Sequence, residues 1–344
     1  MTFDALTRDN LQLTRTTNEV GEAQDEDVIA PVETSTSAAL YAITCTSDLT
    51  ASVQSFVEAG IAPATRRAYR GDLDHFTAWG GSIPSTDAQL AAYLAAHATT
   101  LAVATLVRRL TAISIAHEAH RLPNPARSPL VRAALRGIRR ERGSAQRQAK
   151  PLLRDDLFAV LGAMGGSLKD VRDRALLLIG FAGGFRRSEV VALDCVDIER
   201  VRQGIIVTLR RSKVDPDGKG RKIGIPLGRS KWCPVAALES WIEAAGIENG
   251  PIFRRVDRHR RVSAERLSGE AVCIVVRERV AAAGYEPSGF SGHSLRSGLA
   301  TSAAQAGVST LKIRAQTGHS SDAGLSRYIR DGELFVDNAA GALL

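Results

Sequence analysis

The stretch Ser291-Gly-His-Ser-Leu-Arg296 contains the most informative pair of side chains in this chain of 344 residues. His293 and Arg296 are three positions apart, so on a helix both side chains point the same way. Ser291 and Gly292 are typical of the loop and cap before a helix, where exposed backbone amides favour an anion. Because a lone His-x-x-Arg is more often a capped helix start than a catalytic pair, its meaning depends on the rest of the chain.

Residues of matching chemistry flank this stretch on both sides. They are Arg186 in Gly184-Phe-Arg-Arg-Ser-Glu189, Lys213 in Arg211-Ser-Lys213, His319 after Gly318, and Tyr328 after Arg327. Two arginines and two histidines can bind a phosphoryl group whose negative charge grows during attack. A lysine can protonate a leaving alkoxide, and a tyrosine can form a covalent phosphoester. The ordered set therefore predicts attack by Tyr328 on a phosphodiester.

Neighbouring charges support these roles. Glu189 lies three residues after Arg186 and can accept hydrogen bonds from its guanidinium, which would orient it. An ordinary tyrosine has a pKa of about 10 and is rarely ionised at neutral pH. Positive charges on Arg186, Arg296 and Lys213 would favour the phenolate and so lower the pKa of Tyr328.

The composition is typical of a globular protein. Hydrophobic residues make up 44% of the chain, yet the longest apolar stretch, 175–185, is shorter than the roughly 20 residues that span a bilayer. We therefore expect no membrane contact, and we expect no secretory signal. The four cysteines form no Cys-x-x-Cys pair, so we also expect no disulfide framework. No Asp/Glu cluster, His/Cys arrangement or Gly-x-x-x-x-Gly-Lys loop is present, so we expect no metal, no cofactor and no small-molecule substrate.

Charge is distributed unevenly along the chain. Residues 1–49 contain nine acids and only two bases, Arg8 and Arg15, whereas the whole chain has a net charge of +8. The remainder therefore has a charge of +15, which suits a polyanion such as DNA or RNA. Residues 1–48 lack sustained periodicity and are predicted to be an acidic, disordered arm.

Hydrophobic spacing predicts two domains after this arm. Residues 49–142 show apolar stripes at helical spacing and predict an all-helical domain. Residues 143–152 are polar and predict a linker. Residues 153–344 predict a domain of helices with a small antiparallel sheet, whose strands we place at 196–199, 204–210 and 221–226. A turn signal at Asp215-Pro-Asp-Gly218 puts Lys213 near a hairpin tip.

Arginine is concentrated at the end of the helical domain. Arg132, Arg136, Arg139 and Arg140 share one face of a predicted helix. On the preceding helix, Leu106, Leu110 and Ile113 should face inward while Arg108 and Arg109 face elsewhere. Because dense like charges repel one another without an anionic partner, we expect these six arginines to contact DNA phosphates.

The order Arg, Lys, His-x-x-Arg, Gly-His, Tyr resembles that of the tyrosine recombinase (phage integrase) family. The pieces Ser291-Gly-His-Ser294, Arg211-Ser-Lys213 and Tyr328-Ile-Arg330 are most similar to Cre-like site-specific recombinases. The resemblance covers roughly residues 50–344. It implies a mainly α fold, in which an all-α core-binding domain and a mixed catalytic domain form a C-shaped clamp around duplex DNA.

The resemblance also implies a role for each site residue. Tyr328 would form a 3′-phosphotyrosyl bond, Arg186, His293 and Arg296 would activate the phosphate, and His319 would hydrogen-bond the transition state. Lys213 would be the general acid for the 5′-hydroxyl. Lys219 and Lys222 stay open as alternatives, because some relatives place this lysine in a context like Gly218-Lys-Gly220.

The same resemblance implies an assembly. A monomer in free solution would form a homotetramer on synapsed double-stranded DNA with a specific target site, and strands would be exchanged through a Holliday junction. Residues 333–344 would dock on a neighbouring protomer. The protein would be cytoplasmic and associated with the nucleoid. One departure is Thr317, where many members have leucine, and we expect it to alter packing more than chemistry.

Two other functions use similar residues. A type IB topoisomerase shares the chemistry but relaxes DNA as a monomer, so relaxation of a plasmid lacking target sites would indicate it. A non-catalytic DNA-binding protein on the same fold would lack a covalent intermediate. The helical domain, the basic linker and the complete set of six site residues favour the recombinase.

Overall fold

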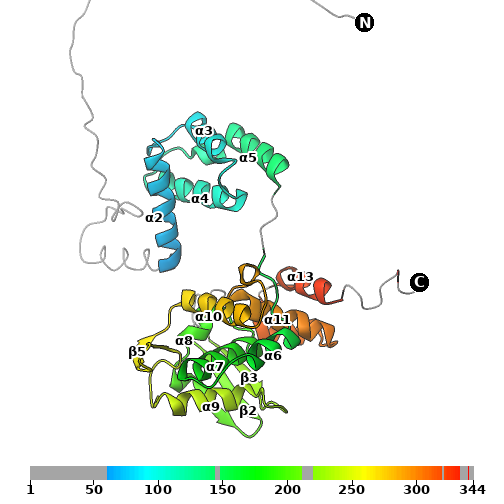
Figure 1. The fold of residues 1–344 in the computed structure, drawn as a ribbon. Helices are drawn as coiled ribbons and strands as arrows, with labels where there is room; N and C mark the ends of the chain where they lie inside the picture. Colours follow the sequence, from blue (N-terminus) through cyan, green and yellow to red (C-terminus); the bar gives the residue numbers. More distant parts are fainter. Residues whose placement is uncertain (1–59, 144–147, 211–219, 320, 334–339, 341–344) are drawn as a thin grey trace, which may run out of the picture. The chain divides into compact units, whose positions relative to one another are not determined.

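The computed structural model describes residues 60–143, 148–210, 220–319, 321–333 and 340. The chain divides into two compact units, residues 1–146 and 147–344 (Figure 1). The predicted acidic arm, Lys213 with Lys219, and all but the first residue and Ala340 of the predicted docking segment lie outside the described residues. None of the described helices is long and apolar enough to cross a membrane.

The described part of the first unit is all helical, as its apolar periodicity predicts. Ser128 and Thr86 each accept a hydrogen bond from a backbone N–H in the first helical turn, which fixes two of the helix starts. Phe76, Tyr93 and Leu106 are buried in a shared core. The helices are α2 (Pro63–Ala78), α3 (Asp87–His97), α4 (Val103–Ala119) and α5 (Pro129–Arg142), with a 3₁₀ turn η1 (Pro125–Arg127) before the last.

The second unit is built around α7 (Leu168–Ala182), which is buried along most of its length. Helices α9 and α11 pack against it. Its other helices are α6 (Arg154–Gly162), α8 (Arg187–Ala192), α9 (Pro234–Ala244), α10 (Gly269–Ala282), α11 (His293–Gln305), α12 (Thr310–Thr317) and α13 (Asp322–Glu333), with 3₁₀ turns η2 (Cys195–Asp197) and η3 (Pro287–Gly289). The predicted fold class, mainly α with small antiparallel sheets, is confirmed.

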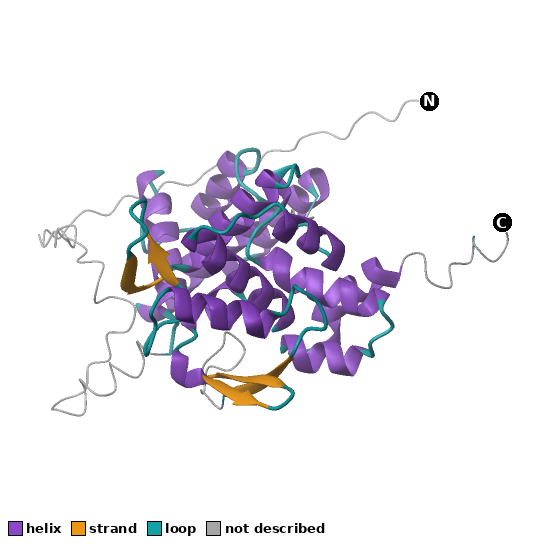
Figure 2. Cartoon of the chain, turned by 60° about the horizontal axis from the view of Figure 1, so that its bottom comes forward, coloured by secondary structure: helices purple, strands orange, loops and turns teal. Residues whose placement is uncertain are grey.

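The strands described in the second unit form two separate sheets (Figure 2). β1 (Ile198–Val201), β2 (Gly204–Leu209) and β3 (Arg221–Pro226) form an antiparallel sheet in that order. Arg221 pairs with Leu209, so the chain leaves β2 and returns on β3 directly opposite. The register therefore brings the first residue of β3 to the same end of the sheet at which β2 finishes.

Two sequence-based assignments in this unit are wrong. The first strand begins at Ile198, because the Asp197 carboxylate accepts the Asp194 backbone N–H and closes a 3₁₀ turn over residues 195–197. A second sheet, β4 (Arg254–Val256) with β5 (Val262–Arg266), was missed. Its strands are short and rich in arginine, so they lack the alternation of apolar and polar residues that identifies a half-buried strand.

Residues 150–152 run along α11, the helix that begins at His293. The Lys150 and Leu152 backbone N–H groups donate to the carbonyls of Gly289 (2.8 Å) and Ser294 (2.9 Å). At Gly298 the helix has no side chain, and a Cβ there would overlap the Leu152 carbonyl oxygen. The end of the predicted linker is thus attached to the start of α11.

Replacing Gly298 by alanine should lower the free energy of unfolding by about 1–3 kcal/mol, because backbone atoms of residue 152 must move to admit the methyl group. Gly162→Ala is the matched control, since a Cβ at Gly162 meets nothing within 4 Å, and it should be neutral or stabilising. Urea denaturation of both variants measures the difference. Equal stabilities would show that α11 and residues 150–152 are less tightly packed than described.

Candidate active site

Arg186 lies at the N-terminal end of α8, just after the turn that ends α7. Gly184 in this turn has φ +59°, a left-handed conformation that favours glycine. The Arg186 Nη1 donates to Glu189 Oε1 (2.7 Å), and its backbone N–H donates to Oε2 (2.8 Å). Because Glu189 is buried, this ion pair fixes the orientation of the Arg186 side chain.

Arg296 is the largest charged side chain that is fully buried in the second unit, among the residues described. Its Nη1 donates to the carbonyls of Gly184 (2.7 Å) and Thr317. Its Nη2 is buried and has no hydrogen-bond partner among the residues that the structure describes. Burial, followed by the positive charge of Arg186, lowers the pKa of Arg296 to about 10. A buried cation with an unused donor is costly unless an anion binds there.

Tyr328 is held beside α11 by a small apolar cluster. α13, which carries this tyrosine, packs on α11, and Tyr328 itself packs against buried Ala300, Ile313 and Leu325. Its hydroxyl oxygen lies 2.6 Å from His293 Nε2. Packing within the second unit therefore brings together the tyrosine and the histidine that the sequence placed 35 positions apart.

The two histidines of the site stay neutral at physiological pH. His293 is exposed at the surface, yet the protein atoms packed around its ring, and then Arg296 and Arg186, lower its pKa. Burial lowers the pKa of His319 to about 4, with further contributions from Arg296 and Arg186. The His319 ring centroid lies 5.9 Å from that of Tyr328, and that of His293 lies 6.0 Å away. Both rings can therefore act as proton acceptors.

Arg221, which sequence analysis did not select, lies in the same charged cluster. Its Nη1 donates to the carbonyls of Ala315 (3.0 Å) and Gln316 (2.9 Å) in the last turn of α12. Its guanidinium packs on Gly318, where a Cβ would lie 2.5 Å from Cζ. Burial and the charge of Arg186 lower the pKa of Arg221. The sequence alone does not distinguish Arg221 from the neighbouring lysines and arginines, because it is the pairing of β3 with β2 that brings Arg221 to the site.

The structure thus brings together five of the six predicted catalytic residues. These are Arg186, His293, Arg296, His319 and Tyr328. The sixth, Lys213, lies outside the described residues, whereas Lys222 is described and exposed on β3. Both histidine rings lie beside that of Tyr328, and the guanidinium groups of Arg186, Arg221 and Arg296 are close enough to lower the pKa of His319. Glu189 is a buried carboxylate beside Arg186.

Comparisons with known proteins agree with this geometry. Residues 151–333 match the phage integrase family. The chain is 38% identical over 293 residues to the integrase/recombinase xerD homolog of Selenomonas ruminantium, covering 82% of this chain and 86% of that protein. It is 28% identical over 263 residues to recombinase cre of Escherichia phage P1, covering 71% of this chain and 74% of that protein.

The fold is also similar to that of lambda integrase in two solved structures. One is a dimer bound to a COC′ core site, with a TM-score of 0.58, 20% identity, and coverage of 82% of this chain and 94% of that chain. The other is a tetramer bound to a Holliday junction, with a TM-score of 0.53, 18% identity, and coverage of 78% and 74%.

The chain belongs to the phage integrase family. It is a site-specific tyrosine recombinase, an enzyme that breaks and rejoins DNA. The resemblance seen in its motifs is thereby confirmed, and none of these comparisons favours the topoisomerase alternative.

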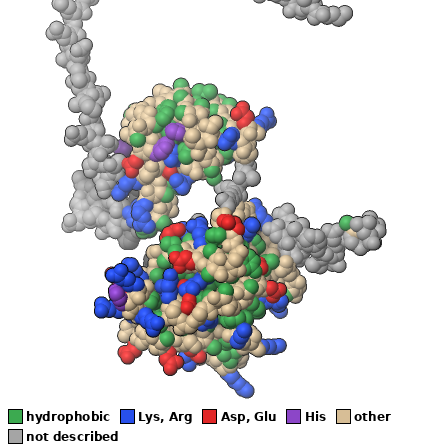
Figure 3. Space-filling model, in the orientation of Figure 1, with side chains coloured by type: hydrophobic (Ala, Val, Ile, Leu, Met, Phe, Trp, Pro, Cys, Tyr) green, Lys and Arg blue, Asp and Glu red, His purple; other side chains and the backbone are tan. Residues whose placement is uncertain are grey.

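The recombinase presents basic side chains on both units (Figure 3). Arg132, Arg136, Arg139 and Arg140 are all exposed on α5, opposite buried Val131 and Ile138. No carboxylate pairs with any of the four in the part of the chain that the structure describes. This face is therefore open to phosphates.

The prediction that Arg109 faces away from the core is wrong. Its side chain is buried and donates from Nη1 to the hydroxyl of Tyr93 (2.9 Å) and contacts His75 Nδ1 (2.7 Å). Its neighbour Arg108 is half exposed and donates to both carboxylate oxygens of Asp72 (2.7 and 2.8 Å). Hydrophobic spacing alone misplaced Arg109, because a buried polar network can take an arginine that the periodicity assigns to the surface.

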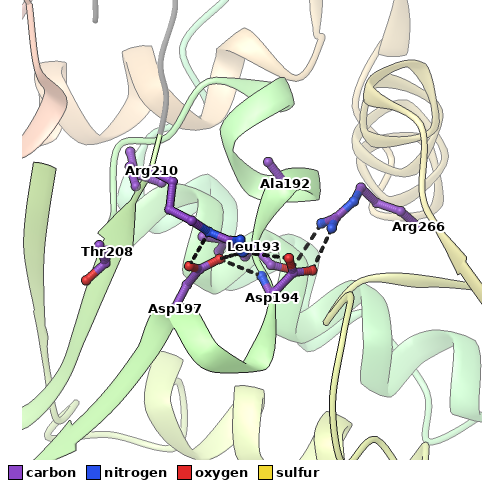
Figure 4. A pocket seen from close by; sticks show the side chains of 8 residues that line it. Ala192, Leu193, Asp194, Asp197, Thr208, Arg210 and Arg266 are labelled. Carbon is purple, nitrogen blue, oxygen red and sulfur yellow. Dashed lines mark hydrogen bonds and ion pairs between the residues drawn. The ribbon is translucent and has the colours of Figure 1, made fainter. Parts of the chain in front are cut away.

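A hollow of about 380 Å³ lies elsewhere in the second unit. Asp194 and Asp197 line it and form ion pairs with Arg210, and Asp194 also pairs with Arg266 (Figure 4). The opposite charges neutralise one another, and none of the proposed catalytic residues lines the hollow. We therefore interpret it as a structural ion-pair network that joins β2, β5 and the end of α8.

Replacing Arg221 by glutamine should raise the pKa of His319 from about 4, because a positive charge that opposes imidazole protonation is removed. NMR titration of the His319 ring protons measures the shift. Arg200→Gln is the control, since Arg200 is an exposed arginine on the same sheet, paired with Glu239. A His319 pKa that is identical in all three proteins would exclude Arg221 from the charged cluster.

Proposed function

We propose that Tyr328 is the nucleophile of this recombinase and forms a 3′-phosphotyrosyl bond with its target DNA. The observation that carries the proposal is the 2.6 Å contact between the Tyr328 hydroxyl and His293 Nε2, next to a buried Arg296 with an unused Nη2 donor. A proton acceptor in contact with the Tyr328 hydroxyl and a buried group that can bind an anion are thus carried by the same helix, α11.

The proposed step balances with these groups. The Tyr328 oxygen bonds to phosphorus as the bond from phosphorus to the 5′ oxygen breaks. The phenolic proton passes to neutral His293, and the leaving 5′ oxygen takes a proton from a general acid. We propose Lys213 for the acid, with Lys219 and Lys222 as alternatives on the same hairpin. Energy of the phosphodiester is conserved in the protein–DNA bond, so the reaction reverses without a cofactor.

The arginines are proposed to bind the phosphate during this step. Arg186 is oriented by Glu189, and Arg296 is fixed through two backbone carbonyls, so neither side chain has to be ordered when DNA binds. Preorganised donors in a buried site stabilise developing charge more than donors in water do. His319 lies beside these arginines, and their positive charges contribute to the lowering of its pKa.

We further propose that the recombinase acts on a specific double-stranded DNA site as a homotetramer and is a monomer when free. The support is the fold, which is similar to that of lambda integrase in a tetramer bound to a Holliday junction. Residues 333–344 would dock on a neighbouring protomer. Such an enzyme would act in the cytoplasm, in association with the nucleoid.

Tyr328→Phe should bind DNA normally and give no covalent product, because only the phenolic oxygen is lost. The assay uses a suicide substrate with a nick near the cleavage site, denaturing electrophoresis and mass spectrometry of the trapped peptide. Tyr285→Phe is the matched control, since the Tyr285 hydroxyl binds Asp156 outside the site. A wild-type adduct on any residue other than Tyr328 would contradict the assignment.

The exposed face of α5 should contribute to binding through phosphates. Replacing Arg132, Arg136, Arg139 or Arg140 singly by alanine should reduce the slope of log affinity against log salt by about one, because one fewer counterion is released. Arg127→Ala is the control, because Arg127 already pairs with Glu118 (2.7 Å). Fluorescence anisotropy at several salt concentrations measures the slope. Unchanged slopes in all four variants would show that this face of α5 does not contact DNA phosphates.

A further inference from the structure

Thr317, the last residue of α12, is completely buried, and its hydroxyl oxygen has two close polar neighbours. One is the backbone carbonyl oxygen of Ile313, 2.7 Å away, to which the hydroxyl donates. The other is Nδ1 of His319, 2.8 Å away. Where many relatives have leucine, this threonine was expected to alter packing more than chemistry.

The protons on these atoms can be assigned from the hydrogen-bond network. A carbonyl oxygen can only accept, so the single hydroxyl proton of Thr317 must point to Ile313. The same oxygen can then only accept from His319. Nδ1 of His319 therefore carries a proton, and it donates that proton to Thr317.

His319 holds a single ring proton at neutral pH. Its surroundings lower its pKa to about 4, through burial first and then through the positive charges of Arg296, Arg186 and Arg221. Since Nδ1 carries that proton, Nε2 has a free lone pair. Neutral His319 can thus accept a hydrogen bond or a proton at Nε2, but it cannot donate one there.

The unprotonated edge of the ring is directed toward α13. A Cβ on Gly324 would lie 3.6 Å from Cδ2 of His319, the carbon bonded to Nε2. Gly324 precedes Tyr328 by four residues, so the two positions share a face of the helix. The opposite edge of the ring, with Nδ1, is held against the end of α12 by Thr317.

We propose that Thr317 is a positioning residue that holds His319 as its Nδ1–H tautomer, so that His319 presents a proton-accepting Nε2 on the side of Tyr328. This inference rests on the proposed function of Tyr328. It also assigns a direction to the hydrogen bond expected of His319: the ring can donate to a phosphoryl oxygen only after Nε2 has taken up a proton. Threonine at this position therefore changes the chemistry of the site.

The tautomer can be observed directly. Long-range ¹H–¹⁵N correlation NMR at pH 7 should show a protonated Nδ1 and a bare Nε2 for His319 in the wild-type protein. Thr317→Val keeps the shape and the backbone carbonyl that Arg296 binds but removes the hydroxyl, so the ring should shift toward the Nε2–H form. Thr317→Ser, which keeps the hydroxyl, should retain the wild-type tautomer. A bare Nδ1 in the wild type, or an unchanged tautomer in Thr317→Val, would overturn the proposal.

Single-turnover cleavage of the suicide substrate tests the consequence. Thr317→Val should cleave about tenfold more slowly or worse, at an unchanged Kd for DNA, because the Nε2–H form of His319 can no longer accept a hydrogen bond or a proton on the side of Tyr328. Thr317→Ser should cleave at close to the wild-type rate. A shifted tautomer with an unchanged cleavage rate would show that the accepting Nε2 of His319 does not contribute to cleavage. Absence of any Tyr328 adduct in the wild type would instead overturn the proposed function and leave the tautomer assignment standing.

Discussion

The catalytic unit depends on one buried guanidinium. Arg296 joins three segments that are far apart in sequence, since its Nη1 binds the carbonyl that follows α7 and the carbonyl that ends α12, while its backbone belongs to α11. Because a buried charge must be compensated, these contacts are more constrained than ordinary packing. The unused Nη2 leaves part of that compensation to a bound anion, which couples the stability of the site to its substrate.

Burial, together with the positive charges of Arg296 and Arg186, lowers the pKa of both histidines of the site. Arg186, Arg221 and Arg296 lie together with the buried carboxylate of Glu189, and all three arginines lower the pKa of His319. The cluster is therefore electrostatically strained in the absence of DNA. A phosphate would relieve the strain, and the same field that binds it keeps both imidazoles neutral until a proton arrives.

Much of this could be predicted from the sequence. The residue types and their order identified the chemistry, since arginine, histidine and tyrosine have few other reasons to occur in that pattern. Apolar spacing identified most helices, and the Arg186–Glu189 contact follows from positions three apart in one helical turn. These features depend on residues that are close together in the chain, so their spacing can be read directly from the sequence.

The tertiary structure decided the rest, because it depends on contacts between distant residues. Strand pairing brings the Arg221 guanidinium against Gly318. A buried hydrogen-bond network with Tyr93 holds Arg109 inside the first unit, where the sequence predicted an exposed side chain. Thr317 and His319 are only two residues apart, yet the direction of their hydrogen bond depends on α12. The Thr317 hydroxyl donates its proton to the Ile313 carbonyl of that helix, so its oxygen can only accept from His319. The sequence thus determined which chemical groups are present, whereas packing determined which of them meet, and in which protonation state.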